Sequence, residues 1–265
     1  MSSLSIPLPH AARITRPERT TAFGKIVHNE ARLAWRRPIG LAGGIGVPVI
    51  LLVVFGELPA FHRPDASFGG LTPFDVYVPI LLVMGLALLA VLGLPMSLVS
   101  HRQLGILRRL STTPVPPSWL LGAQFLVQMC IALATVLVVL TTSITAFGLP
   151  APKSLAGLLL ATLLSIASLL ALGLVVAALA NTPNGASVIG RVLFFPLMFF
   201  AGLWLPREAM PAVLATISGY TPLGAAVEAM QDSMQQGFPP VTPLLVLAGY
   251  AVVFGYLAKR TFRWE

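Results

Sequence analysis

Long apolar runs recur along the whole of this 265-residue chain. A helix needs about 20 consecutive apolar residues to cross a bilayer, and these runs reach that length. Charged residues make up only 10% of the chain, whereas a soluble globular protein has about 25%. The runs lack the strict alternation of a membrane β-barrel, so helices are the expected form. The sequence therefore predicts an all-α integral membrane protein.

Six of these runs are expected to be transmembrane helices. They cover Ile39–Leu58, Val76–Val99, Trp119–Gly148, Ser154–Ala180, Ser187–Leu205 and Val241–Ala258. Because they leave no room for a soluble catalytic domain, residues 39–265 are predicted to be one six-span membrane domain. Residues 1–21 are rich in proline, serine and arginine and have no apolar core. That composition is typical of a disordered cytoplasmic tail and not of a cleavable signal.

Basic residues segregate to one side of the six predicted spans. If both termini are placed in the cytoplasm, 14 of the 17 basic residues lie on the cytoplasmic side, counting Arg191 near the inner end of the fifth span. The three exceptions are Arg63, Lys153 and Arg207. The acids on the outer side are Glu57, Asp65, Asp75, Glu208, Glu228 and Asp232. This asymmetry predicts a multi-pass protein of the cytoplasmic membrane with both termini in the cytoplasm. The net charge of +8 then indicates contact with anionic membrane lipids and not with nucleic acid.

An amphipathic helix is predicted over residues 22–38, ahead of the first span. Its apolar face would carry Phe23, Ile26, Val27, Ala31, Ala34 and Trp35, opposite Lys25, Asn29, Arg32 and Arg36. Such a helix suits the inner surface of the membrane, with Trp35 at the depth of the headgroups. A short solvated helix is the alternative.

A polar insert, HRQLGILRRLSTTPVPPSW, separates the second and third spans. A short helix in its first half would have one apolar side, formed by Leu104, Leu107 and Leu110. The same segment contains Arg102, Arg108 and Arg109. The prolines that follow end this helix, because proline lacks the amide donor. The arginines place the insert in the cytoplasm. It is either an ordinary loop or a helix that docks a soluble partner.

A second distinctive segment separates the fifth and sixth spans. Residues 212–219 and 223–234 have a helical, moderately apolar pattern but are too short to span a bilayer. We expect re-entrant or interfacial helices on the outer side, which act either as a simple extracellular cap or as a gate over the exit. The residues expected to form this outer structure are Pro206, Glu208, Pro211, Pro222, Glu228 and Asp232.

No pattern of catalytic or metal-binding residues accompanies these segments. The chain has a single cysteine, Cys130, and no glycine-rich phosphate-binding loop of the GxxxxGK[ST] kind. Every predicted span centre is uncharged, whereas ion-driven carriers generally need an ionisable residue or a broken helix near the midplane. A pore driven from outside the membrane domain is therefore favoured over an ion-coupled secondary transporter. A non-transporting membrane scaffold is the third interpretation.

Two motifs resemble the permease subunits of ABC transporters of the type-2 exporter class, which includes drug, lipid and polysaccharide exporters. The first is Gly105–Leu110, followed by Thr113-Pro114-Val115 and Leu120-Leu121-Gly122. The second runs from Phe195-Pro196 to Pro211 and continues at Thr221-Pro222-Leu223. The resemblance covers nearly the whole chain. It departs at His101–Leu104, which lacks the glutamate that family members often carry before the coupling-helix glycine.

The resemblance implies specific site residues. An elbow helix at the inner surface would use Phe23, Ile26, Val27, Arg32, Trp35 and Arg36. A coupling helix would dock an ABC ATPase through Arg102, Leu104, Gly105, Leu107, Arg108, Arg109 and Leu110.

The resemblance also implies partners and function. A second permease subunit would complete a homodimer or heterodimer, and ATP and Mg would bind only to the ATPase, so this chain itself would carry no cofactor and no catalytic residue. The uncharged spans, rich in leucine and phenylalanine, suit a hydrophobic or amphipathic cargo such as a drug-like molecule or a lipid. The expected function is export of that cargo across the cytoplasmic membrane.

Overall fold

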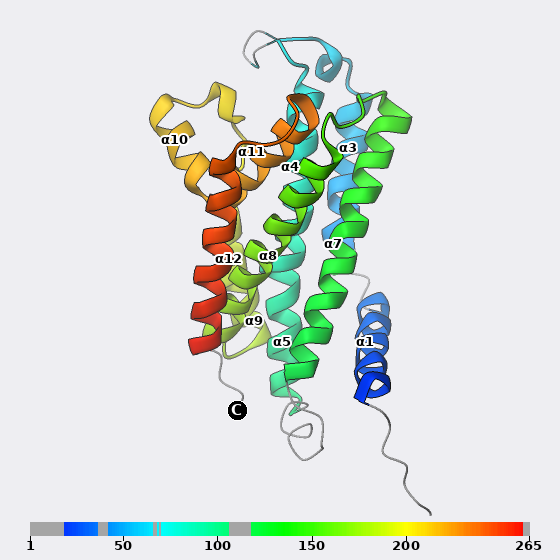
Figure 1. Ribbon diagram of the computed structural model, residues 1–265, viewed down its shortest axis with the longest axis vertical. Helices are drawn as coiled ribbons and strands as arrows, with labels where there is room; N and C mark the ends of the chain where they lie inside the picture. The colour runs from blue at the N-terminus through cyan, green and yellow to red at the C-terminus, as the bar shows by residue number, and fades with distance from the viewer. Residues whose placement is uncertain (1–18, 37–41, 66–67, 69, 106–117, 262–265) are drawn as a thin grey trace, which may run out of the picture.

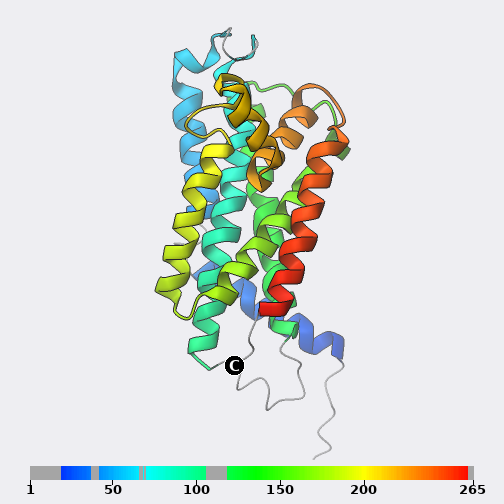
Figure 2. The same ribbon diagram turned by 90° about the vertical axis from the view of Figure 1, so that its left-hand side faces the viewer.

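The computed structural model describes residues 19–36, 42–65, 68, 70–105 and 118–261, and the regular structure within these ranges is helical. Long helices form a bundle, with a pair of short helices packed at one end and another helix running across the opposite end (Figure 1, Figure 2). We call these the α10–α11 end and the α1 end.

The described residues form the following elements in chain order. They are α1 (Arg19–Arg36), the π-helical η1 (Ala42–Gly46), α3 (Val47–Glu57), the 3₁₀ turn η2 (Pro59–His62), α4 (Pro73–Ala87), the π-helical η4 (Leu88–Gly93), α5 (Leu94–Gln103), α7 (Ser118–Phe147), α8 (Leu155–Leu179), α9 (Pro183–Phe200), the 3₁₀ turn η5 (Arg207–Ala209), α10 (Ala212–Tyr220), α11 (Pro222–Gln235) and α12 (Val241–Thr261).

Five helices in the described ranges are long and apolar enough to cross a membrane: Pro73–Gln103, Trp119–Phe147, Leu155–Leu179, Pro183–Phe200 and Val241–Thr261. The second to sixth predicted spans are therefore confirmed as apolar helices of sufficient length. The first predicted span corresponds to the shorter apolar helix Ala42–Glu57. Residues 37–41, which precede it, lie outside the described ranges.

The start of α9 differs from the prediction. The hydroxyl of Thr182 accepts a hydrogen bond of 3.0 Å from the backbone N–H of Gly185, and Pro183 occupies the first turn, where its missing N–H is not needed. The helix consequently begins four residues before Ser187. Arg191 is its ninth residue of 18 and lies at its middle. The predictions that Arg191 lies near a span end, and that every span centre is uncharged, are therefore wrong.

Other helix starts follow the same logic of hydroxyl caps. Thr72 and Asp75 form a capping box at α4: the Asp75 N–H donates to Thr72 Oγ1 over 3.2 Å, and the Thr72 N–H donates to Asp75 Oδ2 over 3.1 Å. Ser154 caps α8 and Thr221 caps α11 through their hydroxyls. These caps satisfy the first free amides of each helix at points where the chain turns.

The continuous helix through α4, η4 and α5 is the centre of the bundle and the most buried of the five long helices. It packs against α8 and α9 on one side and against α3 and α7 on the other. In turn, α12 packs along α8, and α11 wedges between α8, α12 and α4. Because α7, α9 and α12 lie at the outside of the bundle, much of their surface is left exposed.

Two long helices approach the backbone of the central helix closely at η4, where it is π-helical. A Cβ added at Gly173 of α8 would lie 2.0 Å from the carbonyl oxygen of Ala90, and one at Gly190 of α9 would lie 2.8 Å from that of Val91. Glycine at these two positions is what allows both helices to approach the π-helical turn. Single π-turns often occur at functional sites. Here the turn is held between two neighbouring backbones.

We predict that Gly173→Ala destabilises the protein by about 1–3 kcal/mol, because the new methyl group meets backbone that has no room to move. Gly249→Ala is the matched control, since Gly249 lies inside α12 with no atom within 4 Å of its would-be Cβ. It should leave stability unchanged or raise it slightly. Thermal unfolding of both variants in detergent measures the difference. Equal melting temperatures for the two would contradict the close packing at η4.

Candidate functional site

A buried polar cluster joins three helices at the α1 end. The side-chain amide nitrogen of Gln124, on α7, donates to Glu30 Oε2 of α1 over 2.9 Å. The same nitrogen is 2.9 Å from Ser97 Oγ and 3.2 Å from His101 Nδ1, both on α5. Glu30 is only 8% exposed and Gln124 only 4%. We call these four residues the Gln124 cluster.

The packing of α1 explains why Glu30 is buried. Figure 2 shows α1 running across the foot of the bundle, and it packs against α7. Phe23 anchors the contact with its ring edge-on to Trp119, at 5.8 Å between ring centroids. Glu30 lies two turns farther along the same face, because seven residues complete almost two helical turns.

The elbow-helix residues divide between the two faces of α1, which begins at Arg19 and thus three residues before the predicted start. Phe23, Ile26 and Val27 are partly buried, whereas Arg32 and Arg36 are exposed. Trp35, expected on the apolar face, is 80% exposed and does not pack against the bundle.

The end of α5 is tied to the connection between α8 and α9. The Arg102 guanidinium donates to the backbone oxygen of Ala180, and Gln103 Nε2 donates to that of Asn181 over 3.5 Å. Figure 1 shows α5 reaching farther toward the α1 end than α8, α9 or α12. We call Arg102, Gln103, Ala180 and Asn181 together the α5 junction.

The structure corrects the start of the predicted coupling helix. Arg102 lies in the last turn of α5, and Gly105 has a φ of +65°, a left-handed conformation that ends a helix. A continuous helix from Arg102 to Leu110 is therefore wrong. Leu104 is exposed at this helix end. The other predicted docking residues, Leu107, Arg108, Arg109 and Leu110, lie outside the described ranges.

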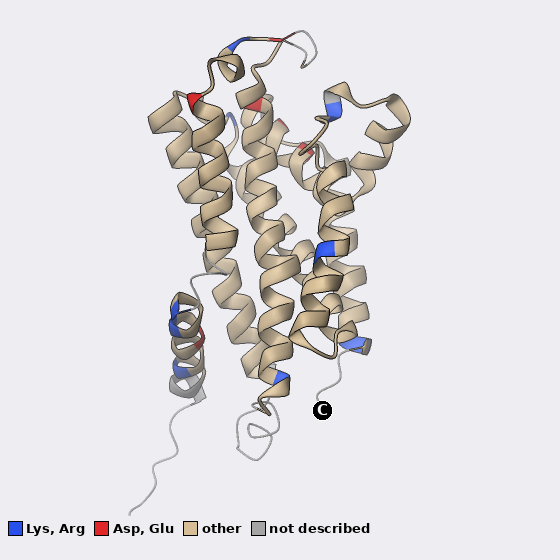
Figure 3. Ribbon diagram, turned by 180° about the vertical axis from the view of Figure 1, so that it is seen from behind, with Lys and Arg blue, Asp and Glu red and all other residues tan. Residues whose placement is uncertain are grey.

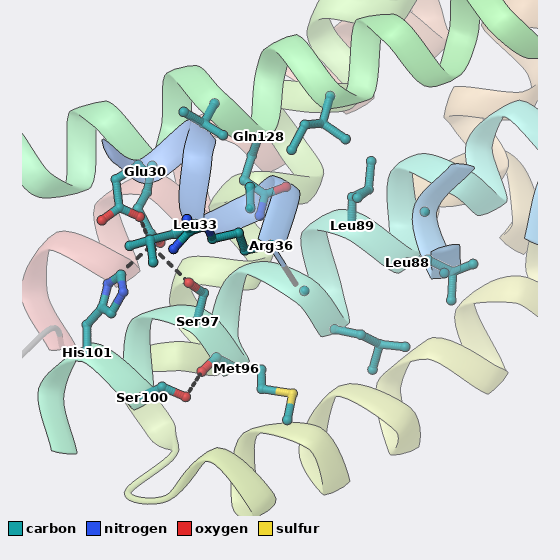
Figure 4. Close-up of a pocket in the computed structure, with 18 residues that line it drawn as sticks. Glu30, Leu33, Arg36, Leu88, Leu89, Met96, Ser97, Ser100, His101 and Gln128 are labelled. Carbon is teal, nitrogen blue, oxygen red and sulfur yellow. Dashed lines mark hydrogen bonds between the residues drawn. The ribbon is translucent and has the colours of Figure 1, made fainter. Parts of the chain in front are cut away.

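A cavity of about 670 Å³ lies beside the Gln124 cluster. Side chains and backbone from α1, η1, η4, α5 and α7 line it, so the two π-helical turns both contribute to its wall. Figure 4 shows Glu30, Ser97 and His101 pointing toward one another at one side of this space. Gln124 and Gln128 also line it, and the Oε1 atoms of both are buried with no hydrogen-bond partner among the described residues.

A second charged cluster lies at the α10–α11 end. Arg207 of η5 forms an ion pair with Glu228 of α11. Both residues, together with Asp232, line a smaller cavity of about 160 Å³. The structure thus brings together two of the acids predicted for the outer site, and adds Arg207 to them.

The other predicted outer residues start or belong to short helical elements. Pro206 precedes η5, Pro211 precedes α10, and Pro222 is the first residue of α11. Proline suits these positions because its φ is already helical and no amide is needed there. Glu208 lies within η5, and its side chain is outside the described part of the structure.

The two ends of the bundle differ in charge. Figure 3 shows most of the described acidic residues at the α10–α11 end, while the α1 end is predominantly basic. The acid that breaks this pattern is Glu30, and it is buried in the Gln124 cluster. The charge segregation seen in the sequence is therefore also a segregation in space.

The Gln124 cluster was not predicted from the sequence. Two signals for it are visible in retrospect. Glu30 continues the three- and four-residue spacing of Phe23, Ile26 and Val27, so it falls on the packed face of α1. Gln124 and Gln128 are four residues apart in an otherwise apolar helix and share one face of it. Polar residues that repeat on one face of a membrane helix mark an interior site.

The acidic pair on α11 leads to a prediction about pH. Burial raises the pKa of the Asp232 carboxyl above its usual range, the nearby charge of Glu228 raises it further, and Arg207 opposes the shift. When the pKa of a carboxyl is higher in the folded state than in the unfolded state, ionising it lowers the stability of the fold. This loss begins as pH rises above 3.8, the ordinary pKa of the aspartate carboxyl. Asp232→Asn should therefore raise the melting temperature at neutral pH, and this gain should vanish on acidification through the folded pKa. Glu57→Gln, which changes an exposed acid at the same end, is the control. Parallel pH profiles for wild type and Asp232→Asn would contradict the assignment.

Comparison with known proteins agrees with this architecture. Residues 21–235 match the family described as ABC-2 type transporter. A daunorubicin resistance ABC transporter permease protein of Streptomyces coeruleorubidus is 26% identical over 261 residues, covering 94% of this chain and 89% of that protein. The transport permease ycf38 of Pyropia yezoensis is 25% identical over 198 residues, covering 73% of this chain and 67% of that protein.

The family match settles the general class of the protein. Members are transport permease subunits of ABC transporters and are not themselves catalytic, and their function implies an ABC ATPase as partner. The match covers most of the chain, and the apolar helices are those of a multi-pass membrane protein. The chain belongs to the ABC-2 type transporter family, as a permease subunit.

Proposed function

We propose that this chain is a six-span permease subunit of an ATP-driven exporter. It moves a hydrophobic or amphipathic molecule, drug-like or lipid, outward across the cytoplasmic membrane. A separate ATPase binds ATP and Mg, and this chain supplies the path and the movement. The Streptomyces coeruleorubidus relative is a daunorubicin resistance permease, which supports a cargo of this kind.

The observation that carries the proposal is how the end of α5 is connected. The Gln124 cluster links α5 to α7 and α1, and the α5 junction links it to the connection between α8 and α9. The segment that follows α5 in the chain contains the coupling motif. A force applied to that segment would therefore reach α1, α7 and the connection between α8 and α9 through polar contacts.

The first of the six spans is the helix formed by η1 and α3. Its 16 described residues are about 24 Å long at 1.5 Å per residue, slightly short of a bilayer core of about 30 Å. Local thinning of the bilayer accommodates the difference. With this helix counted, both termini lie on the same side of the membrane.

That side is the cytoplasm. The α1 end is predominantly basic, and basic residues are retained on the cytoplasmic side of membrane proteins. There they attract anionic lipid headgroups at about 1 kcal/mol each. The α10–α11 end then faces outward, and α11, which is buried between α4, α8 and α12, is a re-entrant helix over the exit.

A second permease subunit completes the path. The outer face of α9 exposes Val188, Val192 and Phe195 together with Arg191, at the middle of the helix. A charged side chain at that depth avoids hydrocarbon, so this face is covered by protein or lines water. Lipid covers the remaining apolar faces.

The orientation can be tested with reporter fusions. A reporter that works only in the cytoplasm should be active after Glu265 or between Thr112 and Ser118, and inactive when inserted near Asp65 or Gln236. The reason is the positive charge that keeps the α1 end inside. Activity at Asp65 combined with inactivity at Glu265 would overturn the orientation.

The coupling role can be tested at Leu107. Leu107→Asp should leave membrane insertion intact but lower ATPase recovery in a pull-down by about tenfold or more, because burying an unpaired carboxylate in a docking groove is unfavourable. Replacing Arg108 and Arg109 with alanine is the control. As rim contacts, these arginines should each contribute only about 0–1 kcal/mol to the free energy of ATPase binding. Normal pull-down and export by well-inserted Leu107→Asp would rule out this docking segment.

Arg102→Met separates docking from transmission in the same assays. It removes the contact with Ala180 while keeping the aliphatic stem. The ATPase should still be recovered, whereas export should fall several-fold. Unchanged export would show that the α5 junction transmits nothing.

A further inference from the structure

We propose that the cavity beside the Gln124 cluster binds the protonated amine of an amphipathic molecule. The ammonium group lies against Glu30, Gln124 and Gln128, and the apolar body lies along η4 and α5. This inference deepens the proposed function, on which it rests for the role of the ligand in transport. The binding itself does not depend on the ATPase.

The polar wall of the cavity includes two glutamines whose amide oxygens are buried and have no hydrogen-bond partner among the described residues. The amide nitrogen of Gln124 donates to Glu30, because a carboxylate oxygen can only accept. The amide oxygen of Gln124 therefore points elsewhere, and it is buried with no hydrogen-bond partner among the described residues. The amide oxygen of Gln128, one turn farther along α7, is in the same state. A ligand that brings several donors satisfies this wall, and an ammonium group brings three donors and no acceptor.

The charge of the wall favours a cation. Glu30 is 8% exposed and accepts its hydrogen bond from a neutral amide. A buried carboxylate is stabilised most by a positively charged partner in contact with it. Arg36 also lines the cavity, but its side chain is exposed, so water screens its charge more strongly than that of Glu30.

The rest of the wall fits an apolar body. Leu33, Leu88, Leu89, Leu92 and Met96 line the cavity. The volume of about 670 Å³ lies within the range of about 300–1,000 Å³ that is typical of small-molecule sites. Met96 adapts its shape readily because its side chain is unbranched and flexible. The cavity thus has one polar corner beside an apolar wall, which matches a molecule with a single amine and a hydrocarbon or aromatic body.

Two sources supply this chemistry: a free amphipathic amine and the amine headgroup of a membrane lipid. Phosphatidylethanolamine has the required N–H donors. Phosphatidylcholine carries the same positive charge but has no N–H group to donate. The two lipids therefore distinguish a hydrogen-bonded headgroup from simple charge attraction.

The test uses the full chain in nanodiscs of phosphatidylcholine, with radiolabelled decylamine as probe and decanol of equal chain length as competitor. Binding to empty nanodiscs is subtracted. We expect the labelled decylamine to bind saturably. Decanol should compete for the site at least about tenfold more weakly than unlabelled decylamine, because decanol cannot form the charge-assisted hydrogen bond.

Three variants locate the site. Glu30→Gln should weaken decylamine binding by about tenfold or more, and Gln128→Leu by about two- to tenfold. Glu30→Gln keeps an oxygen that accepts from Gln124, so the packing of α1 is retained. Glu57→Gln makes the same change at an exposed position near the other end and should bind like wild type. Gel filtration checks that each variant is monodisperse.

The outcomes separate the hypotheses. Weaker decylamine binding in nanodiscs that contain phosphatidylethanolamine would identify the lipid headgroup as the occupant, and unchanged binding would identify the free amine; both support an amine site. Equal binding of decylamine and decanol, or wild-type affinity in Glu30→Gln and Gln128→Leu, would overturn it. If the amine binds but is not exported with the ATPase present, the proposed function fails while the site stands.

Discussion

The close contact of three backbones around η4 is the constraint on which the rest of the bundle depends. The π-helical turn at Leu88–Gly93 is met by α8 at Gly173 and by α9 at Gly190. Gly44 of η1 meets Leu89 of the same turn, where an added Cβ would be 2.2 Å from its side chain. Neighbouring backbone excludes a side chain at Gly173 and Gly190, so the positions of α8 and α9 relative to the central helix are set here. The central helix continues as α5 and reaches the α1 end of the bundle.

Polar contacts connect the helices at the α1 end. In an apolar bundle, hydrogen bonds between side chains on different helices are few and buried, and each fixes a relative orientation. The Gln124 cluster joins α1, α5 and α7, and the α5 junction joins α5 to the turn before α9. The cavity beside the cluster borders the same helices. In the proposed mechanism, a ligand in this cavity and a force from the ATPase would act on the same set of contacts, so cargo binding would influence coupling.

Much of the fold was predictable because transmembrane helices are specified by local apolar runs. The five long helices agree with prediction to within a few residues. The errors arise where a different interaction decides the boundary. The cap at Thr182 starts α9 before its apolar run and places Arg191 at mid-helix. Likewise, α5 continues through His101 and Arg102, which look like loop residues, because both are held by contacts with other helices.

The candidate sites were less predictable for a related reason. Glu228 and Asp232 were found from their spacing on one helix, whereas Arg207 and the ion pair it forms depend on how η5 folds back. The Gln124 cluster draws on three elements separated by up to 94 residues, and no local pattern reports such a meeting. The placement of Glu30 on an apolar stripe and the four-residue spacing of Gln124 and Gln128 were the signals that the sequence offered.

The central claim is that an ATPase on a separate chain drives this permease. The most direct measurement is ATP hydrolysis in the eluate when the tagged chain is purified in mild detergent from the membranes of its own host. The account predicts a co-purifying ATPase subunit whose rate of hydrolysis changes when an amphipathic cargo is added. Proton-driven transport by the reconstituted chain alone, with no ATPase in the eluate, would contradict it.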